Sequence, residues 1–292
     1  MRVLLTGGTG FIGRALSAAL QERRDHVAIV SRSASPGAVG WDEVEAEVGR
    51  ADAVVHLAGE PVAGARWTRE RLQAIRSSRV DSTDRIARAI ASAAKRPRVF
   101  VSGSAVGLYG LRLDDARLDE TSPPGDDELA RIVVAWERAS APAGGVTRVV
   151  HARIGIVLGR GGGALESMAA PFRWFVGGAI GTGKQWLSWI HLRDAVCALL
   201  FAIDHDRVTG PFNVTAPEPV DMNTFARALG RAVRRPAALR VPSFALRLAL
   251  GRGLAEVVLS GQRVVPRKLL EAGFVFELPG LEAALEAIFG EA

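Results

Sequence analysis

The amino-acid sequence predicts an α/β fold, in which helices cover both faces of a parallel β-sheet. Short apolar strands alternate with longer helical patterns through the first half of the chain, and a glycine-rich turn follows the first strand directly. The 292 residues can form a large core, and this length is near that at which one domain divides into two lobes. We therefore expect a Rossmann-type doubly wound sheet with a smaller mixed C-terminal lobe.

The expected elements follow in chain order. Strands are predicted over residues 3–5, 26–30, 53–57, 98–101 and 148–153, and helices over 11–20, 71–94 and 128–139. After Gly159 the pattern changes to glycine-rich loops, with a helix around 168–175, a cap at Asp221 before NTFARAL, and a last helix in LEAALEAIF. We predict a Rossmann domain over 1–159, rejoined by 188–215 through a helix at 192–203 and a strand at 211–214. Residues 160–292 would form the substrate or C-terminal lobe.

Composition narrows the classes of partner. The formal charge of +6 comes almost entirely from arginines scattered along the predicted helices, so we do not expect a nucleic-acid binder, which concentrates such charge on one face. The longest apolar runs are too short to span a membrane, and the strand-like start carries no signal-peptide pattern, which predicts a cytoplasmic protein. The single cysteine, Cys197, lies in an apolar helical pattern and is interpreted as a buried small side chain.

The stretch TGGTGFIG carries the first functional signal. Gly7, Gly10 and Gly13 lie at three-residue intervals, and residues 8–13 also fit the G-x-G-x-x-G fingerprint. The glycines follow a strand and open a helix, so backbone N–H groups and the helix N-terminus can meet a pyrophosphate. An ordinary strand-to-helix turn is the alternative interpretation.

The end of the second strand indicates which dinucleotide is preferred. An acidic residue there would bind the ribose hydroxyls of NAD, but the sequence HVAIVSRSA places Ser31 and Arg32 at this point. A guanidinium beside a hydroxyl suits the additional phosphate of NADP. The alternative is an arginine that is simply solvated at the surface.

Two later strand ends should lie at the same carboxyl edge of the sheet, where ligands of open α/β folds bind. Leu57, Ala58 and Gly59 form a small-residue turn that lets a dinucleotide approach. One strand later, VFVSGSAVGLYG should place three hydroxyl groups near the nicotinamide, those of Ser102, Ser104 and Tyr109. Such a hydroxyl can relay a proton or merely form a turn, and the sequence leaves both readings open.

At this point the sequence resembles a known family over essentially its whole length. TGGTGFIG, DAVVHLAGEP, RWTRERLQAIRSSRV, SGSAVGLYG, GGAIGTGKQWLSWIHLRDAV and the C-terminal VPSFALRLALG are similar to the atypical extended short-chain dehydrogenase/reductases called NAD(P)-dependent epimerase family proteins, which carry a C-terminal domain of unknown function, here 240–290. The resemblance implies an NADP(H) site, with contacts from Gly7, Gly10, Phe11, Ile12, Gly13, Ser31, Arg32, Leu57, Ala58, Arg79 and Val157. Of these, Arg79 and Val157 rest on the resemblance alone.

The sequence also departs from the wider superfamily. Its active members couple a Ser to a Tyr-x-x-x-Lys helix, in which the Lys lowers the pKa of the Tyr so that the phenol exchanges a proton during hydride transfer. Tyr109 is the only tyrosine, and the corresponding helix positions hold Leu129 and Val133. Ser104 and Tyr109 are therefore the catalytic candidates. Other titratable or pocket-wall candidates are Glu60, Lys184, His191, Trp67, Trp186 and Trp189, although a histidine before a helix is more often a structural group.

These observations predict an NADP(H)-binding oxidoreductase or epimerase that acts on a hydroxyl, carbonyl or nucleotide-sugar substrate. The alternative is an NADP(H)-binding regulator without turnover, which the missing Tyr-x-x-x-Lys pair favours. We expect a small-molecule substrate, no nucleic-acid or membrane partner and no bound metal, because no metal-ligand spacing is present. The oligomeric state stays open, with a homodimer as one option.

Overall fold

A seven-stranded parallel sheet forms the centre of the protein in a computed structural model, which describes residues 1–32, 38–62 and 66–290. The strand order is β12-β7-β5-β4-β1-β2-β3, which is the doubly wound Rossmann arrangement. The strands are β1 (Arg2–Thr6), β2 (His26–Val30), β3 (Ala38–Val39), β4 (Ala53–His56), β5 (Val99–Ala105), β7 (Arg148–Ile154) and β12 (Gly210–Val214). The predicted fold class is confirmed.

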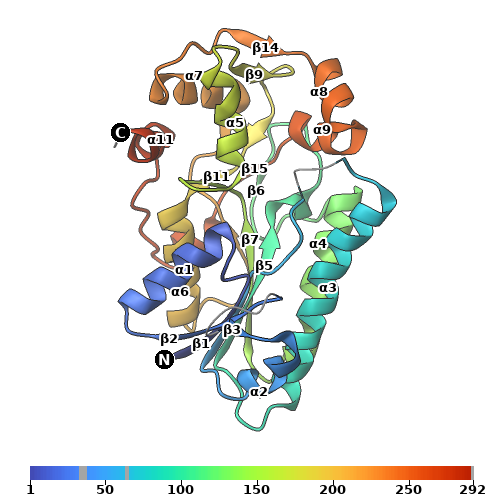
Figure 1. The fold of residues 1–292 in the computed structure, drawn as a ribbon, viewed down its shortest axis with the longest axis vertical. Coiled ribbons are helices and arrows are strands. Elements are labelled where there is room, and N and C mark those ends of the chain that lie inside the picture. The colour runs from blue at the N-terminus through green and yellow to red at the C-terminus, as the bar shows by residue number, and fades with distance from the viewer. Residues whose placement is uncertain (33–37, 63–65, 291–292) are drawn as a thin grey trace.

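Helices cover both faces of this sheet (Figure 1). One face packs against α1 (Phe11–Glu22) and α6 (Leu192–Asp204), and the other against α2 (Val44–Val48), α3 (Arg69–Ser92) and α4 (Glu128–Arg138). Alternate side chains of each strand enter the two cores, as Leu5 and Leu4 do from β1. Because both faces are buried, β1 and β4 contain continuous apolar runs, whereas β7 also carries Arg148, His151 and Arg153.

The C-terminal lobe has a core of its own, built mainly from α5 (Ala164–Arg173), α7 (Met222–Ala232) and α11 (Leu281–Phe289). The helices α8 (Ser243–Leu250) and α9 (Arg252–Leu259) follow α7 in the chain, and α10 (Arg267–Glu271) packs its Leu269 into the core of the central sheet beside β12. Four two-stranded ladders pair β6 (Arg117–Leu118) with β15 (Arg263–Val264), β8 (Ile156–Leu158) with β11 (Trp189–His191), β9 (Gly178–Ile180) with β14 (Leu239–Val241), and β10 (Trp186–Leu187) with β13 (Val220–Asp221). Three 3-10 turns complete the described elements: η1 (Trp41–Glu43), η2 (Val106–Tyr109) and η3 (Ala141–Ala143).

Local capping explains where several helices begin. Thr68 accepts a hydrogen bond from the N–H of Arg71, so α3 begins at Arg69, two residues before the predicted start. Asp221 caps α7 through the N–H of Thr224, as predicted. The helix predicted around 168–175 instead spans Ala164–Arg173, and Trp174 and Phe175 lie beyond its end.

Candidate functional site

The glycine turn between β1 and α1 contains two kinds of glycine. Gly7 has a φ of +73°, and a Cβ there would lie 2.7 Å from the backbone N of Ala58. A Cβ on Gly13 would lie 2.1 Å from the carbonyl O of Gly7. Gly10, in contrast, has an ordinary φ of −76°, and the nearest atom to its Cβ position is 3.2 Å away. Gly7 and Gly13 are therefore required by the fold, whereas a Cβ on Gly10 would make one tight contact, with the carbonyl O of Gly7, and would otherwise face open space.

That space belongs to a cleft of about 730 Å³ at the carboxyl edge of the sheet. Three segments predicted from sequence meet there: the glycine turn, the end of β2, and the turn after β4. The lining residues are Gly7, Thr9, Gly10, Val30, Ser31, Arg32, Leu57, Ala58, Gly59 and Glu60, together with Trp41 and, from α3, Ala74, Ser77, Ser78, Asp81, Ser82 and Arg85. Sequence reasoning missed Trp41 and the small polar residues of α3.

Positive charge gathers at the β2 end of the cleft. Arg32 is exposed and forms no hydrogen bond or ion pair with another residue in the part of the chain that the structure describes. Arg85 lines the same cleft, but its guanidinium donates two hydrogen bonds to the carboxylate of Glu45, at 2.7 and 3.1 Å. Arg32 is thus the arginine at this end whose donors remain available to a ligand.

A buried histidine supports the floor of the cleft. Thr6 contacts the Nδ1 of His56 at 2.5 Å, and Ser82 contacts its Nε2 at 3.0 Å. Ser82 donates its own hydrogen to the carbonyl of Ser78, so Nε2 of a neutral His56 donates to Ser82 and Nδ1 accepts from Thr6. Complete burial, together with the charge of Arg79, lowers the pKa of His56 to about 3. In the sequence, the only sign of this role is that the apolar strand β4 ends in a histidine.

Arg79 lies behind the turn that follows β4. Its Nη1 donates to the carbonyls of Glu60 and Ile75, and a Cβ on Gly59 would lie 3.1 Å from its guanidinium carbon. The guanidinium also lies 5.1 Å from the centre of the Trp136 ring. Burial lowers the pKa of Arg79 to about 10. In this structure Arg79 holds the turn in place rather than lining the cleft.

The hydroxyl groups predicted at the nicotinamide edge are buried. Ser102 is completely buried and donates to the carbonyl of Gly103 at 3.3 Å. Ser104 is 3% exposed and donates to the carboxylate of Glu137 at 2.6 Å. Glu137 accepts two further hydrogen bonds from Arg153, at 2.8 and 2.9 Å. Ser104 is therefore one member of a buried ionic network that the sequence did not reveal.

Tyr109 belongs to the same network. Its hydroxyl donates to Asn213 at 2.7 Å and accepts from Arg153 at 3.1 Å, and its ring is completely buried. Burial raises the pKa of the phenol despite the neighbouring guanidinium. Tyr109 holds η2 against β7 and β12 here, so its predicted part in proton transfer would require this network to open.

Helix α4 carries apolar side chains where the superfamily places its Tyr and Lys. Leu129 packs against Gly107, where an added Cβ would lie 3.1 Å from its side chain. Val133 is 2% exposed and belongs to the small core around Tyr109. Neither position offers a proton donor.

The other candidates are not gathered at the cleft, apart from Glu60, which lines it and pairs with Arg71 at 2.7 Å. His191 caps α6 by accepting from the N–H of Arg193, and burial lowers its pKa to about 4. Lys184 is exposed, and the thiol pKa of half-buried Cys197 is raised by burial. The indole groups of Trp67, Trp186 and Trp189 donate to Val62, Asp115 and Glu218, in that order. Phe11, Ile12 and Val157 pack in or against the sheet core.

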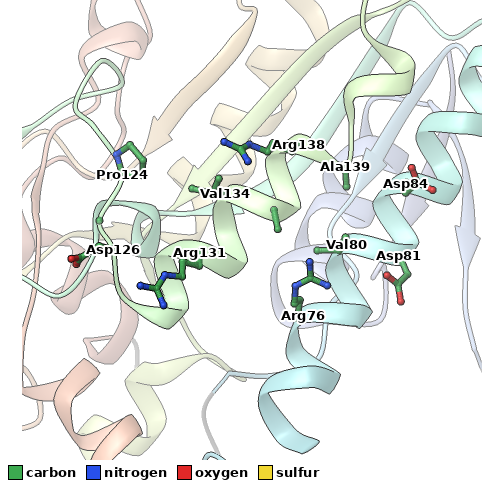
Figure 2. Close-up of a pocket in the computed structure, with 12 residues that line it drawn as sticks. Arg76, Val80, Asp81, Asp84, Pro124, Asp126, Arg131, Val134, Arg138 and Ala139 are labelled. Carbon is green, nitrogen blue, oxygen red and sulfur yellow. The ribbon is translucent and has the colours of Figure 1, made fainter. Parts of the chain in front are cut away.

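A larger groove, of about 920 Å³, lies between α3 and α4 (Figure 2). Arg76 and Asp84 of α3 and Arg131 and Arg138 of α4 are among the residues that line it, and Figure 2 labels them on the two helices. The glycine turn between β1 and α1 lines the cleft at the sheet edge and not this groove, so we place the candidate site in that cleft. Among the described residues there is no group of three or more His, Cys, Asp or Glu side chains placed to hold a metal ion, and no helix is long and apolar enough to cross a membrane.

Comparisons with known proteins agree with this fold. Residues 3–215 match the NAD dependent epimerase/dehydratase family, and residues 241–288 match a domain of unknown function, DUF1731. The chain is 43% identical over 293 residues to the epimerase family protein SDR39U1 of Bos taurus, covering 99% of each chain.

Two solved structures are similar over nearly the whole chain. The human epimerase family protein SDR39U1 (isoform 2), crystallised with NADPH, is 40% identical with a TM-score of 0.96, and all of both chains is covered. A nucleoside-diphosphate sugar epimerase from Corynebacterium glutamicum is 32% identical with a TM-score of 0.83, covering 99% of this chain and 58% of that one.

Proposed function

Because the chain belongs to the NAD-dependent epimerase/dehydratase family, we propose that it binds NADP(H) in the cleft at the sheet edge and acts on a hydroxyl, carbonyl or nucleotide-sugar substrate. The observation that carries the proposal is the space at Gly10, which faces a cleft whose far end holds the available donors of Arg32. The NADPH in the crystallised human relative supports the choice of cofactor.

The residues present fit such a dinucleotide. Gly10 precedes the first turn of α1, whose backbone N–H groups suit a pyrophosphate. Ser31 and Arg32 suit the additional phosphate of NADP(H), and Ala58 leaves room for the adenosine half. When bound, the nicotinamide would supply or accept hydride. The protein's own contribution is to hold the two ends of the cofactor and to present the β5 edge to the substrate.

Proton transfer to or from the substrate would need a group at the β5 edge. We assign proton transfer to Ser104, near the end of β5, because its hydrogen bond to Glu137 gives a proton from Ser104 an acceptor. The buried state of Ser104 and Tyr109 and the apolar side chains of Leu129 and Val133 favour a second candidate function. In this alternative the protein binds NADP(H) as a regulator and carries out no turnover.

A glycine series tests cofactor binding. In Gly10→Val the backbone angles stay allowed, so the apo protein should unfold at nearly the wild-type temperature while the branched side chain blocks the pyrophosphate and NADPH binding fails. Gly10→Ala should show a smaller loss of affinity with the same stability. NADPH binding by Gly10→Val at wild-type affinity would contradict the proposed site.

Turnover separates the two candidate functions. Single-turnover oxidation of bound NADPH, followed by absorbance against a panel of carbonyl and nucleotide-sugar substrates, should show a substrate-dependent reaction if the protein is an enzyme. NADPH binding without oxidation by any member of the panel would favour the regulator.

A further inference from the structure

Three consecutive apolar residues are exposed after α5, and we call Trp174, Phe175 and Val176 the apolar tip. Their exposed fractions are 80%, 60% and 50%. Leu239, also 50% exposed, lies beside this segment because β14 pairs with β9 through Leu239 and Gly178. Apolar side chains that gather on a surface in this way usually mark an interaction site.

The backbone of the apolar tip is strained. Phe175 has a φ of +60°, a conformation that bulky L-residues rarely adopt. Hydrogen bonds fix it there: the N–H groups of Trp174 and Val176 donate to the carbonyl of Pro171, at 3.2 and 3.0 Å. A helix end of this kind normally takes glycine. Arg24 and Arg234 adopt the same conformation just beyond α1 and α7, so what distinguishes Phe175 is an apolar ring exposed beside Trp174 and Val176.

A hollow lined with arginines adjoins the apolar tip. Arg227, Arg231, Arg234 and Arg235, at the end of α7 and just beyond it, line a space of about 650 Å³. The guanidinium of Arg235 lies 4.7 Å from the centre of the Phe175 ring, which joins the hollow to the tip. Arg231 pairs with Glu282, but Arg234 and Arg235 form no ion pair within the described part of the chain. Arg235 donates to the carbonyl of Arg234 at 3.0 Å, so the exposed guanidinium of Arg234 and the remaining N–H donors of Arg235 remain for a ligand.

This surface lies far from the cleft. Figure 1 shows α7, β9 and β14 at one end of the long axis of the molecule, beyond the sheet whose edge forms the cleft. A partner could therefore cover this end and leave the cofactor cleft open.

We propose that the apolar tip and the arginine-lined hollow form a peripheral docking site for a membrane surface that contains anionic lipids. Trp174, Phe175 and Val176 would enter the headgroup region, where aromatic side chains are favoured, and Arg234 and Arg235 would bind lipid phosphates. The apolar side chains sit on one connecting loop and the hollow beside them is cationic. A fluid membrane surface with anionic headgroups fits the apolar tip and the cationic hollow together. A folded acidic protein fits them less well, because its surface would have to match the projecting loop in shape. The docking needs no helix that spans the bilayer, and the sequence did not reveal it because Trp174 and Phe175 were expected within a helix.

Vesicle co-sedimentation of the full chain tests the proposal. Wild-type protein should bind vesicles of phosphatidylcholine with phosphatidylglycerol, bind less as salt rises, and bind weakly to phosphatidylcholine alone. Phe175→Gly relieves the strained φ, so its thermal midpoint should be at least that of the wild type while vesicle binding falls on the order of tenfold. Arg234→Glu with Arg235→Glu should weaken binding by at least roughly 25-fold, from about fivefold for each lost positive charge, and the two added negative charges should weaken it further.

Matched variants away from this surface serve as controls. Val275→Gly removes a side chain that is 82% exposed near α6, and Arg96→Glu reverses an exposed charge near the start of β5. Both should bind vesicles as the wild type does. The proposal is overturned if the wild-type protein does not bind anionic vesicles, or if the tip variants and the control variants bind these vesicles equally well. It is likewise overturned if the wild type does not bind vesicles but binds an acidic peptide, or associates with itself in sedimentation, and the tip variants lose that binding.

Discussion

Replacing Arg32 with alanine should weaken NADPH binding selectively. Arg32 is exposed at the cleft and forms no hydrogen bond or ion pair with another of the described residues, so its loss should leave the free energy of unfolding nearly unchanged. A charge-assisted hydrogen bond to the additional phosphate contributes roughly 1.5 to 3 kcal/mol. The dissociation constant for NADPH should therefore rise by about 10- to 150-fold, and that for NADH, which lacks this phosphate, should stay nearly constant.

Arg85→Ala is the matched control, because Arg85 lines the same cleft but is held by Glu45. Its removal should reduce NADPH affinity much less than the removal of Arg32. Calorimetric titration of both cofactors into the wild type and the two variants gives all the constants. Equal losses for NADPH and NADH in Arg32→Ala would refute the assignment of this end of the cleft to the phosphate, as would a larger selective loss in Arg85→Ala.

Three further predictions concern the surroundings of the cleft. Gly13→Ala should lower the unfolding temperature without cofactor, because its Cβ would lie 2.1 Å from the carbonyl of Gly7; thermal unfolding at the wild-type temperature would contradict this. Tyr109→Phe removes the hydrogen bond that the buried Oδ1 of Asn213 accepts and one of those that Arg153 donates, so it should cost about 1–3 kcal/mol in chemical denaturation. Full stability with lost turnover would instead support proton transfer by the phenol. The pKa of His56 is about 3 in the folded protein and 6.5 in the unfolded chain. Between these values the unfolded state binds one proton more than the folded state. The free energy of unfolding therefore falls as pH drops below 6.5, by about 1.4 kcal/mol per pH unit from this group. His56→Gln should remove this contribution to the slope of unfolding free energy against pH, measured between roughly pH 5 and 6.5. An unchanged slope would show that His56 already accepts a proton in the folded protein.

Much of the cleft could be predicted because its signals are local. The glycine turn, Ser31 with Arg32, and the turn after β4 each follow directly on an apolar strand, and parallel strands bring their carboxyl ends to one edge. Trp41 was missed because η1 reaches the cleft only through the packing of α2 beside α3, which no local pattern encodes.

Tyr109 shows why the nicotinamide edge was harder to predict. Its place after β5 suggested a site-edge phenol, but η2 turns the side chain into a core where Asn213 and Arg153 hold its hydroxyl. Those partners come from β12 and β7, about 104 and 44 residues away in the chain. Contacts at such separation depend on the order of strands in the sheet, which periodicity does not specify.

Equilibrium titration of the unmodified protein with NADPH, and in parallel with NADH, tests the central claim most directly. We expect one NADPH to bind per chain. NADH should bind more weakly, because it lacks the additional ribose phosphate that Arg32 and Ser31 would bind. Absence of NADPH binding, or NADH binding that is as tight or tighter, would contradict the assignment of the cleft to NADP(H).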